Sequence, residues 1–129
     1  DPLRSMPTEI AQRKNIVVQT TGKTKSSGFL EYKNARVRWF LSIDANDLPK
    51  EVKVHGQRTY RSITIAGKEI EFSGGFTELH NICYQEILSG NGCGVEDARC
   101  SIEVLTDIRN MEPIGLKGDY HPFLKKVNF

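Results

Sequence analysis

Two amphipathic helical patterns joined by a glycine-rich elbow, within residues 75–110, constrain this chain more than any other feature. The first pattern repeats apolar residues at steps of three and four: Phe76, Leu79, Cys83 and Ile87. The second has its own apolar stripe: Val95, Ala98, Ile102, Leu105 and Ile108. Thr77 is a candidate N-cap, Gly90 suits a helix C-terminus, and Pro113 ends the second helix. Both stripes need an apolar partner from elsewhere in the chain.

The sequence before these helices is patterned as β-strands. Residues 16–20 and 29–32 form short strand-like runs, and residues 35–43 alternate strictly. The alternation places one set of side chains on each face: Val37, Trp39, Leu41 and Ile43 against Arg36, Arg38, Phe40 and Ser42. A further alternating run, 57–65, is expected to pair with 69–72 as a hairpin through residues 66–68.

These patterns together predict an α+β fold, an open and mostly antiparallel sheet with two helices packed on one face. The 129 residues suit a single domain, and the charged fraction of 26% is that of an ordinary globular protein. Residues 1–13 are expected to be a cloning scar and flexible lead-in, and residues 14–129 a single domain built on the sheet.

Composition also favours some settings over others. The longest apolar run is too short to span a bilayer, and no secretory signal is recognisable. Three cysteines without C-x-x-C spacing favour reduced thiols and hence the cytoplasm. The chain carries a formal net charge of +2, and its lysines and arginines form no dense cluster. Binding to nucleic acid is therefore disfavoured, and an anionic small molecule fits this modest excess better.

Motifs that carry chemistry are mostly absent. Residues 90–94 resemble a phosphate loop only in glycine content, because a helix instead of a strand precedes them, so an elbow between helices is favoured. Asn46 and Asp47 lie in a turn after the alternating strand, where a calcium loop would need a glycine and a distal glutamate that are missing. His80 stands alone on the first helix, and no histidine has metal-ligand spacing. No metal site and no catalytic residue are predicted.

The outward face of the sheet carries the remaining candidates: Arg36, Arg38, Phe40, Arg58 and Tyr60. If the apolar side chains meet the helices, these residues point away from them, with Arg58 and Tyr60 on a neighbouring strand. Such a face can simply be solvated. The mixture of arginines with aromatic rings equally fits a subunit interface or an anionic ligand, since guanidinium groups pair well with carboxylates and phosphates.

Three segments carry a family resemblance: SSGFLEYKNARVRWFLSIDANDLP, GQRTYRSITIAGKEIEFSGGFTELHNICYQEILSGNGCGVEDARCSIEVLTDIR and GDYHPFL. They resemble the back part of Gfo/Idh/MocA-type oxidoreductases, over roughly residues 14–124. The nearest group is the enzymes that oxidise the 3-hydroxyl of UDP-N-acetylglucosaminuronic acid in lipopolysaccharide O-antigen synthesis. The resemblance implies an open antiparallel sheet with helices on one face, whose other face packs against a second subunit.

The same resemblance implies that the catalytic half is elsewhere. Members bind NAD in an N-terminal Rossmann domain with a glycine fingerprint and a Glu-Lys-Pro lysine, and neither motif occurs in these residues. The chain is therefore expected to be a C-terminal substrate-binding and oligomerisation domain, without catalytic or NAD-binding residues of its own. Its parent would be an NAD-dependent UDP-sugar dehydrogenase. The resemblance assigns Arg36, Arg38, Phe40, Arg58 and Tyr60 to the subunit interface and substrate edge, with Asn46, Asp47 and His80 as weaker substrate-side candidates.

Two other functions stay open at this point. The chain could be a stand-alone binding or assembly module of the same fold without redox activity. It could also be a complete small enzyme whose site has no recognisable motif.

Overall fold

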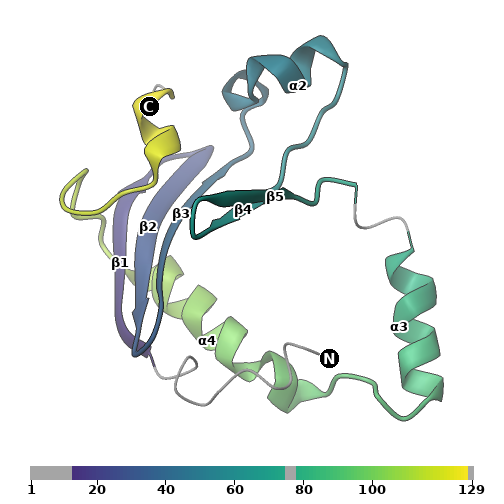
Figure 1. The fold of residues 1–129 in the computed structure, drawn as a ribbon. Helices are drawn as coiled ribbons and strands as arrows, with labels where there is room; N and C mark the ends of the chain where they lie inside the picture. The colour runs from purple at the N-terminus through teal and green to yellow at the C-terminus, as the bar shows by residue number, and fades with distance from the viewer. Residues whose placement is uncertain (1–12, 75–77, 128–129) are drawn as a thin grey trace. The chain divides into compact units, whose positions relative to one another are not determined.

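The structure is a computed structural model that describes residues 13–74 and 78–127, and it divides into two compact units. The first unit combines the chain up to Ile43 with the chain from Gly94 onward, and the second is Asp44–Cys93. Within the described residues the strands are antiparallel, a short helix separates the third strand from the fourth, and the two longer helices follow the last strand (Figure 1). The expected α+β class with open antiparallel sheets is confirmed.

The first unit is built on a three-stranded antiparallel sheet in the order β1-β2-β3. The strands are β1 (Arg13–Thr21), β2 (Lys25–Tyr32) and β3 (Arg36–Ser42). Two tight turns connect them, closed by hydrogen bonds from Gly22 N to Lys25 O and from Tyr32 N to Ala35 O, both 2.8 Å. β1 thus begins at Arg13, one residue before the expected start of the domain at residue 14; residues 1–12 lie outside the described part of the chain.

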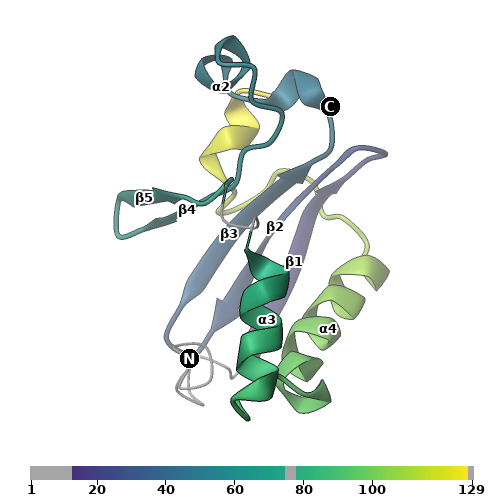
Figure 2. The same cartoon turned by 90° about the vertical axis from the view of Figure 1, so that its right-hand side faces the viewer.

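Helix α4 (Val95–Asn110) belongs to this unit and lies along the sheet on the β1 side, as Figures 1 and 2 show. The apolar side chains of Ile16 and Val18, two positions apart on β1, are buried in this sheet. Farther along, β3 leaves Val37 and Leu41 exposed. Helix α4 contacts this sheet at β1, but Val95, Ile102 and Leu105 of its expected apolar stripe remain exposed.

Beyond α4 the chain crosses the edge of the sheet. Ile114 N and Gly115 N donate to the carbonyl oxygens of Val18 and Gln19, at 3.0 and 2.8 Å. The chain then continues over the sheet to the short 3₁₀ helix η2 (Pro122–Lys125), where Leu124 is buried. We call residues 114–125 the strap. Its side-chain contacts with Arg38 and Phe40 lie on the sheet face opposite to Trp39, whose register position aligns with Gly28 and Val18.

A glycine at the centre of the sheet permits close packing of neighbouring residues. Gly28 pairs with Val18 on β1 and with Trp39 on β3. A Cβ atom at Gly28 would fall against the carbonyl oxygen of Val17 and 2.8 Å from Cζ2 of Trp39. The indole of Trp39 therefore occupies the space that a side chain at this position would need.

The second unit starts with the 3₁₀ helix η1 (Ala45–Asp47) and the short helix α2 (Lys50–Val54), on which Val52 is buried. The hairpin of β4 (Ser62–Ile65) and β5 (Lys68–Glu71) follows. Its turn residues Ala66 and Gly67 have φ of 51° and 82°, the positive pair that a two-residue hairpin turn requires. Helix α3 (Leu79–Leu88) completes the unit and is followed by Gly90 at φ 81°, as the glycine stop predicts.

Two expectations about the strands differ from the structure, and one about the first helix falls on residues outside the described part of the chain. The strand expected at 57–65 is wrong in its first half, because β4 begins only at Ser62. The partner strand sets this limit: beyond the backbone hydrogen bond from Phe72 N to Arg61 O, Arg61 N donates to the side-chain oxygen of Ser73, and residues 73–74 form a turn. The strands also form two sheets instead of one. The expected N-cap Thr77 and the apolar Phe76 lie outside the described residues, and α3 has Glu78 at its N-cap position.

Candidate functional site

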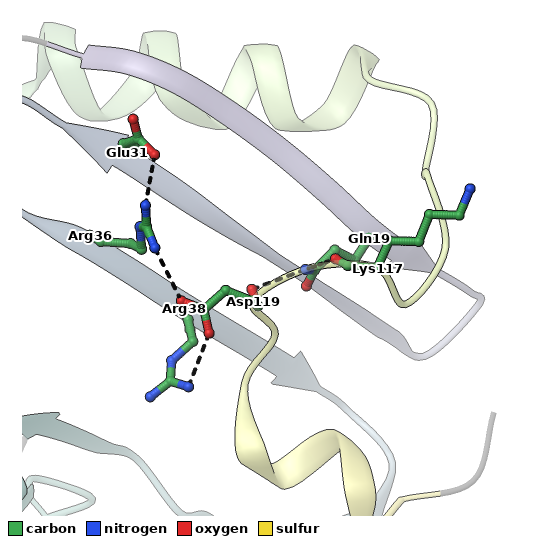
Figure 3. Close-up of polar contacts among 6 residues, drawn as sticks. All are labelled: Gln19, Glu31, Arg36, Arg38, Lys117 and Asp119. Carbon is green, nitrogen blue, oxygen red and sulfur yellow. Dashed lines mark hydrogen bonds and ion pairs between the residues drawn. The ribbon is translucent and has the colours of Figure 1, made fainter.

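The two arginines of β3 lie on the face predicted by the alternation, together with acidic partners. Arg38 Nη1 donates to Asp119 Oδ1 at 3.2 Å, and Arg36 Nη1 lies 3.7 Å from Asp119 Oδ2 (Figure 3). Arg36 also donates to Glu31 Oε2 on β2 at 3.2 Å. The arginine side chains are 57% and 45% exposed, so water screens these pairs and each contributes less than about 1 kcal/mol.

Gln19 fixes the strap more firmly than the ion pairs do. Its side chain is fully buried, and Nε2 donates to the carbonyl oxygens of Lys117 and Asp119 at 2.9 and 3.0 Å (Figure 3). Gln19 lies at a register shift of β1, between the pairs Val18–Gly28 and Thr20–Ser27. This bulge turns the amide toward the strap, and Asp119 is thereby brought to Arg36 and Arg38.

Phe40 packs against aromatic rings of the strap. Its ring stacks on Phe123 with centroids 5.4 Å apart, and the His121 ring lies at 6.4 Å. His121 Nδ1 accepts a hydrogen bond from Phe123 N at 3.1 Å and so caps η2. Burial, and then the positive charge of Arg38, lower the pKa of His121 from its usual 6.5. The neutral imidazole is thus the favoured form beside Arg38.

Sequence reasoning missed the strap as a part of this cluster. Asp119, His121 and Phe123 had no motif signal, and Gln19 looked like an ordinary strand residue. The sequence offered two signals for this segment: GDYHPFL is one of the three stretches that carry the family resemblance, and it is acidic and aromatic in character. The arginines, Phe40 and these four residues meet on one sheet face, where the expectation was a ligand or a second subunit.

Asn46 and Asp47 form η1 in the second unit, directly after β3. Asp44 Oδ1 accepts from Asn46 N at 2.9 Å, and Lys53 Nζ donates to Asn46 O at 3.0 Å. This is the turn chemistry that the sequence favoured over a calcium loop. Within residues 13–74 and 78–127, no three His, Cys, Asp or Glu side chains gather in a way that could hold a metal ion.

Arg58 and Tyr60 are not on a strand beside Arg36 and Arg38, so that part of the expectation is wrong. They precede β4 in the second unit, and the two units have separate sheets. The Tyr60 hydroxyl donates a hydrogen bond to Glu69 Oε1 on β5. This bond is the main cause that raises the pKa of Tyr60 and lowers that of Glu69. His80 is exposed on α3.

The glycine elbow does not fit a dinucleotide. Gly90 ends α3, and Gly94 N donates to Asp97 Oδ2 at 2.7 Å at the start of α4. A carboxylate therefore already occupies the helix N-terminus where a pyrophosphate would have to bind, and no strand of the described chain leads into it. In the same part of the chain, no helix has the length and apolar character needed to cross a bilayer.

No protein-family model matches the chain. Solved structures do match, among them two of the WlbA (WbpB) dehydrogenase from Thermus thermophilus. One, in complex with NAD and alpha-ketoglutarate, is 40% identical with a TM-score of 0.80. The other, in complex with NAD and UDP-GlcNAcA, is 38% identical with a TM-score of 0.79.

Both matches cover 87% of this chain but only 37% and 36% of the dehydrogenase chains. The present chain therefore spans little more than a third of the length of the proteins that it matches. The agreement in both sequence and fold confirms the resemblance stated for residues 14–124. The chain belongs to the family of the WlbA (WbpB) dehydrogenases, as a domain related to one part of them.

Proposed function

We propose that this chain is the C-terminal substrate-binding and oligomerisation domain of an NAD-dependent dehydrogenase of lipopolysaccharide biosynthesis, acting in the cytoplasm on a UDP-N-acetylglucosaminuronic acid type of sugar nucleotide. The observation that carries the proposal is the 40% identity, at a TM-score of 0.80, to a dehydrogenase crystallised with NAD. The related crystal with UDP-GlcNAcA supports the substrate class. On this proposal NAD binds to a Rossmann domain outside these 129 residues, and the chain alone is inactive.

The proposed substrate-side residues divide between the two units. Asn46, Asp47, Arg58, Tyr60 and His80 belong to the second unit, and Arg36, Arg38 and Phe40 to the first. Arg58 and His80 are exposed. A guanidinium group at Arg58 suits the carboxylate or diphosphate of a UDP-uronic acid. Arg36 and Arg38 already share the carboxylate of Asp119, so they are weaker ligand candidates than the sequence suggested.

The β4–β5 hairpin supports the oligomerisation role. Ile63 pairs with Ile70, and Ile65 and Phe72 lie on the same face by alternation. Ile63 is 53% exposed, Ile65 is 62% exposed and Ile70 is 50% exposed. A two-stranded sheet is marginal by itself, and exposed apolar residues gathered on one face are typical of an interface. A second copy of the chain is the proposed partner of this face, and the protein would be a homo-oligomer.

Replacing Ile70 by lysine is expected to weaken self-association. The ammonium group would have to be buried without a partner at the interface, so the dissociation constant should rise at least about tenfold. Sedimentation equilibrium measures this constant. Thr64→Lys is the matched control, because Thr64 lies on the opposite, polar face of the same hairpin. Equal effects of the two substitutions, or a monomeric unsubstituted protein, would rule out this face as the interface.

The alternative function is a stand-alone binding or assembly module. The coding sequence upstream of this chain distinguishes it from the dehydrogenase proposal. The dehydrogenase proposal requires a strand followed by G-x-G-x-x-G and a helix upstream. The protein purified from such an extended reading frame should carry NAD, detectable by mass spectrometry after denaturation. A coding sequence that lacks the fingerprint, or a purified protein that never binds NAD, would favour the module.

A further inference from the structure

The strap closes over the outer face of β1–β3 through contacts of three kinds. Backbone hydrogen bonds attach its start to Val18 and Gln19 at the sheet edge. The Gln19 amide and the two arginines hold its middle at residues 117–119. Its end is held by the stacking of Phe123 on Phe40 and by buried Leu124. The contacts at the start and in the middle of the strap do not depend on the charge of a histidine. The contacts at its end depend on the charge of His121.

His121 connects the end of the strap to the sheet. Its Nδ1 accepts the hydrogen bond from Phe123 N, an interaction that only an unprotonated nitrogen can make. The same ring lies beside Phe40. Protonation at Nδ1 would replace the acceptor by a donor that faces another donor, and η2 would lose its cap.

The charged groups around His121 oppose its protonation. Arg38 faces it from β3, and Asp119 on the strap is engaged with Arg38 and Arg36. On η2 and just after it, Lys125 and Lys126 add positive charge, and Lys126 Nζ lies 6.0 Å from the Phe123 ring centroid. A protonated His121 would therefore add another positive charge beside Arg38, in a cluster where the Asp119 carboxylate already pairs with two arginines.

We propose that the strap is a pH-responsive closure, shut over the outer sheet face while His121 is neutral and released from Phe40 when His121 takes up a proton. Because the pKa of His121 is lowered in the closed form, closure is fully favoured above about pH 6.5 and is lost as the pH falls through the lower pKa of the closed state. Opening uncovers Phe40, while Gln19 and the two arginines keep the middle of the strap in place. The inference is independent of the proposed enzymatic function.

Hydrogen exchange of the 129-residue chain, read by mass spectrometry and corrected for intrinsic rates, tests the closure. Between about pH 8 and about pH 5, peptides from residues 120–127, the end of the strap, should lose protection at least about fivefold, the ratio expected for one lost helix cap. Peptides from β1–β3 should keep theirs. An unchanged strap, or equal loss of protection in the sheet, would overturn the proposal.

Two variants separate the histidine from general acid effects. Asparagine accepts a hydrogen bond at an N-cap but does not titrate, so His121→Asn should keep the strap protected and abolish its pH dependence. His80→Asn, on exposed α3, is the matched control and should leave the pH dependence intact. If His121→Asn retains the pH dependence, the proposal is wrong. As a measurement that needs no variant, the His121 ring resonances should titrate with a midpoint below 6.5; a midpoint at or above that value contradicts the closure.

Discussion

Gly28→Ala is expected to lower the free energy of unfolding of the three-stranded sheet by at least about 3 kcal/mol, at the upper end of the cost of overpacking. The added methyl group meets the Val17 carbonyl oxygen and lies 2.8 Å from Cζ2 of Trp39. The carbonyl belongs to the backbone of β1 and cannot rotate away as a flexible side chain would. The strands must therefore separate, or the indole must leave its position.

Trp39 is the only tryptophan, so its fluorescence during urea unfolding reports on this sheet. Gly22→Ala is the matched control, since a Cβ there meets only Lys25 O at an ordinary 3.8 Å, and its φ lies outside the left-handed region. We expect it to change the free energy of unfolding by no more than about 0.5 kcal/mol. Similar unfolding midpoints for the two variants would contradict the packing described at Gly28.

Gln19→Leu is expected to cost about 2–3 kcal/mol of unfolding free energy, the second-largest effect. The substitution keeps the volume of a fully buried side chain but removes both hydrogen bonds from Nε2. The carbonyl oxygens of Lys117 and Asp119 then lose their donor, and a buried polar group without a partner costs about 1–3 kcal/mol. Gln19 Oε1 has no partner among the described residues, so the loss falls on the Nε2 side alone.

Urea unfolding followed by Trp39 fluorescence measures this effect as well. Gln57→Leu provides the comparison, because Gln57 Nε2 also donates to a backbone carbonyl, that of Thr59, but in an exposed position of the other unit. Its effect on the Trp39 transition should stay within about 0.5 kcal/mol. An equally small effect of Gln19→Leu would show that the strap contributes little to the stability of the sheet.

The local elements could be predicted from the sequence where short-range signals determine them. Alternation located β3, the glycine after Ala66 located the hairpin turn, and the second apolar stripe located α4. The run 57–61 shows the limit of such patterns: alternation continues there, but the partner strand has ended. Strand length depends on the partner as well as on the run itself.

For a related reason, the sequence predicted only the β3 part of the candidate site and not the strap. The alternation of β3 correctly places Arg36, Arg38 and Phe40 on one face. What covers that face comes from the strap, and the decisive bond joins residues 98 positions apart, Gln19 and Lys117. No periodicity links such positions, and Gln19 reaches the strap only because a bulge reorients it. Long-range polar contacts of this kind leave no local pattern in the sequence and become visible only in the folded structure.

The strap also changes the interpretation of the two outward arginines, Arg36 and Arg38. From the sequence they looked available for an anion or a subunit. In the structure they balance Asp119 and Glu31, and Phe40 packs on Phe123. The apolar face of the β4–β5 hairpin, with its exposed isoleucines, is now the better candidate for contact with a second copy.

Turnover of UDP-GlcNAcA by the longer protein that we propose to carry this chain is the measurement that tests the proposed function. The assay supplies NAD and alpha-ketoglutarate and follows the sugar nucleotide by mass spectrometry, with UDP-GlcNAc, which lacks the carboxylate, as the control. We predict a loss of two mass units from UDP-GlcNAcA, as expected for oxidation of one hydroxyl group, and a much slower reaction of the control. A folded, NAD-loaded protein that leaves UDP-GlcNAcA unchanged would contradict the account.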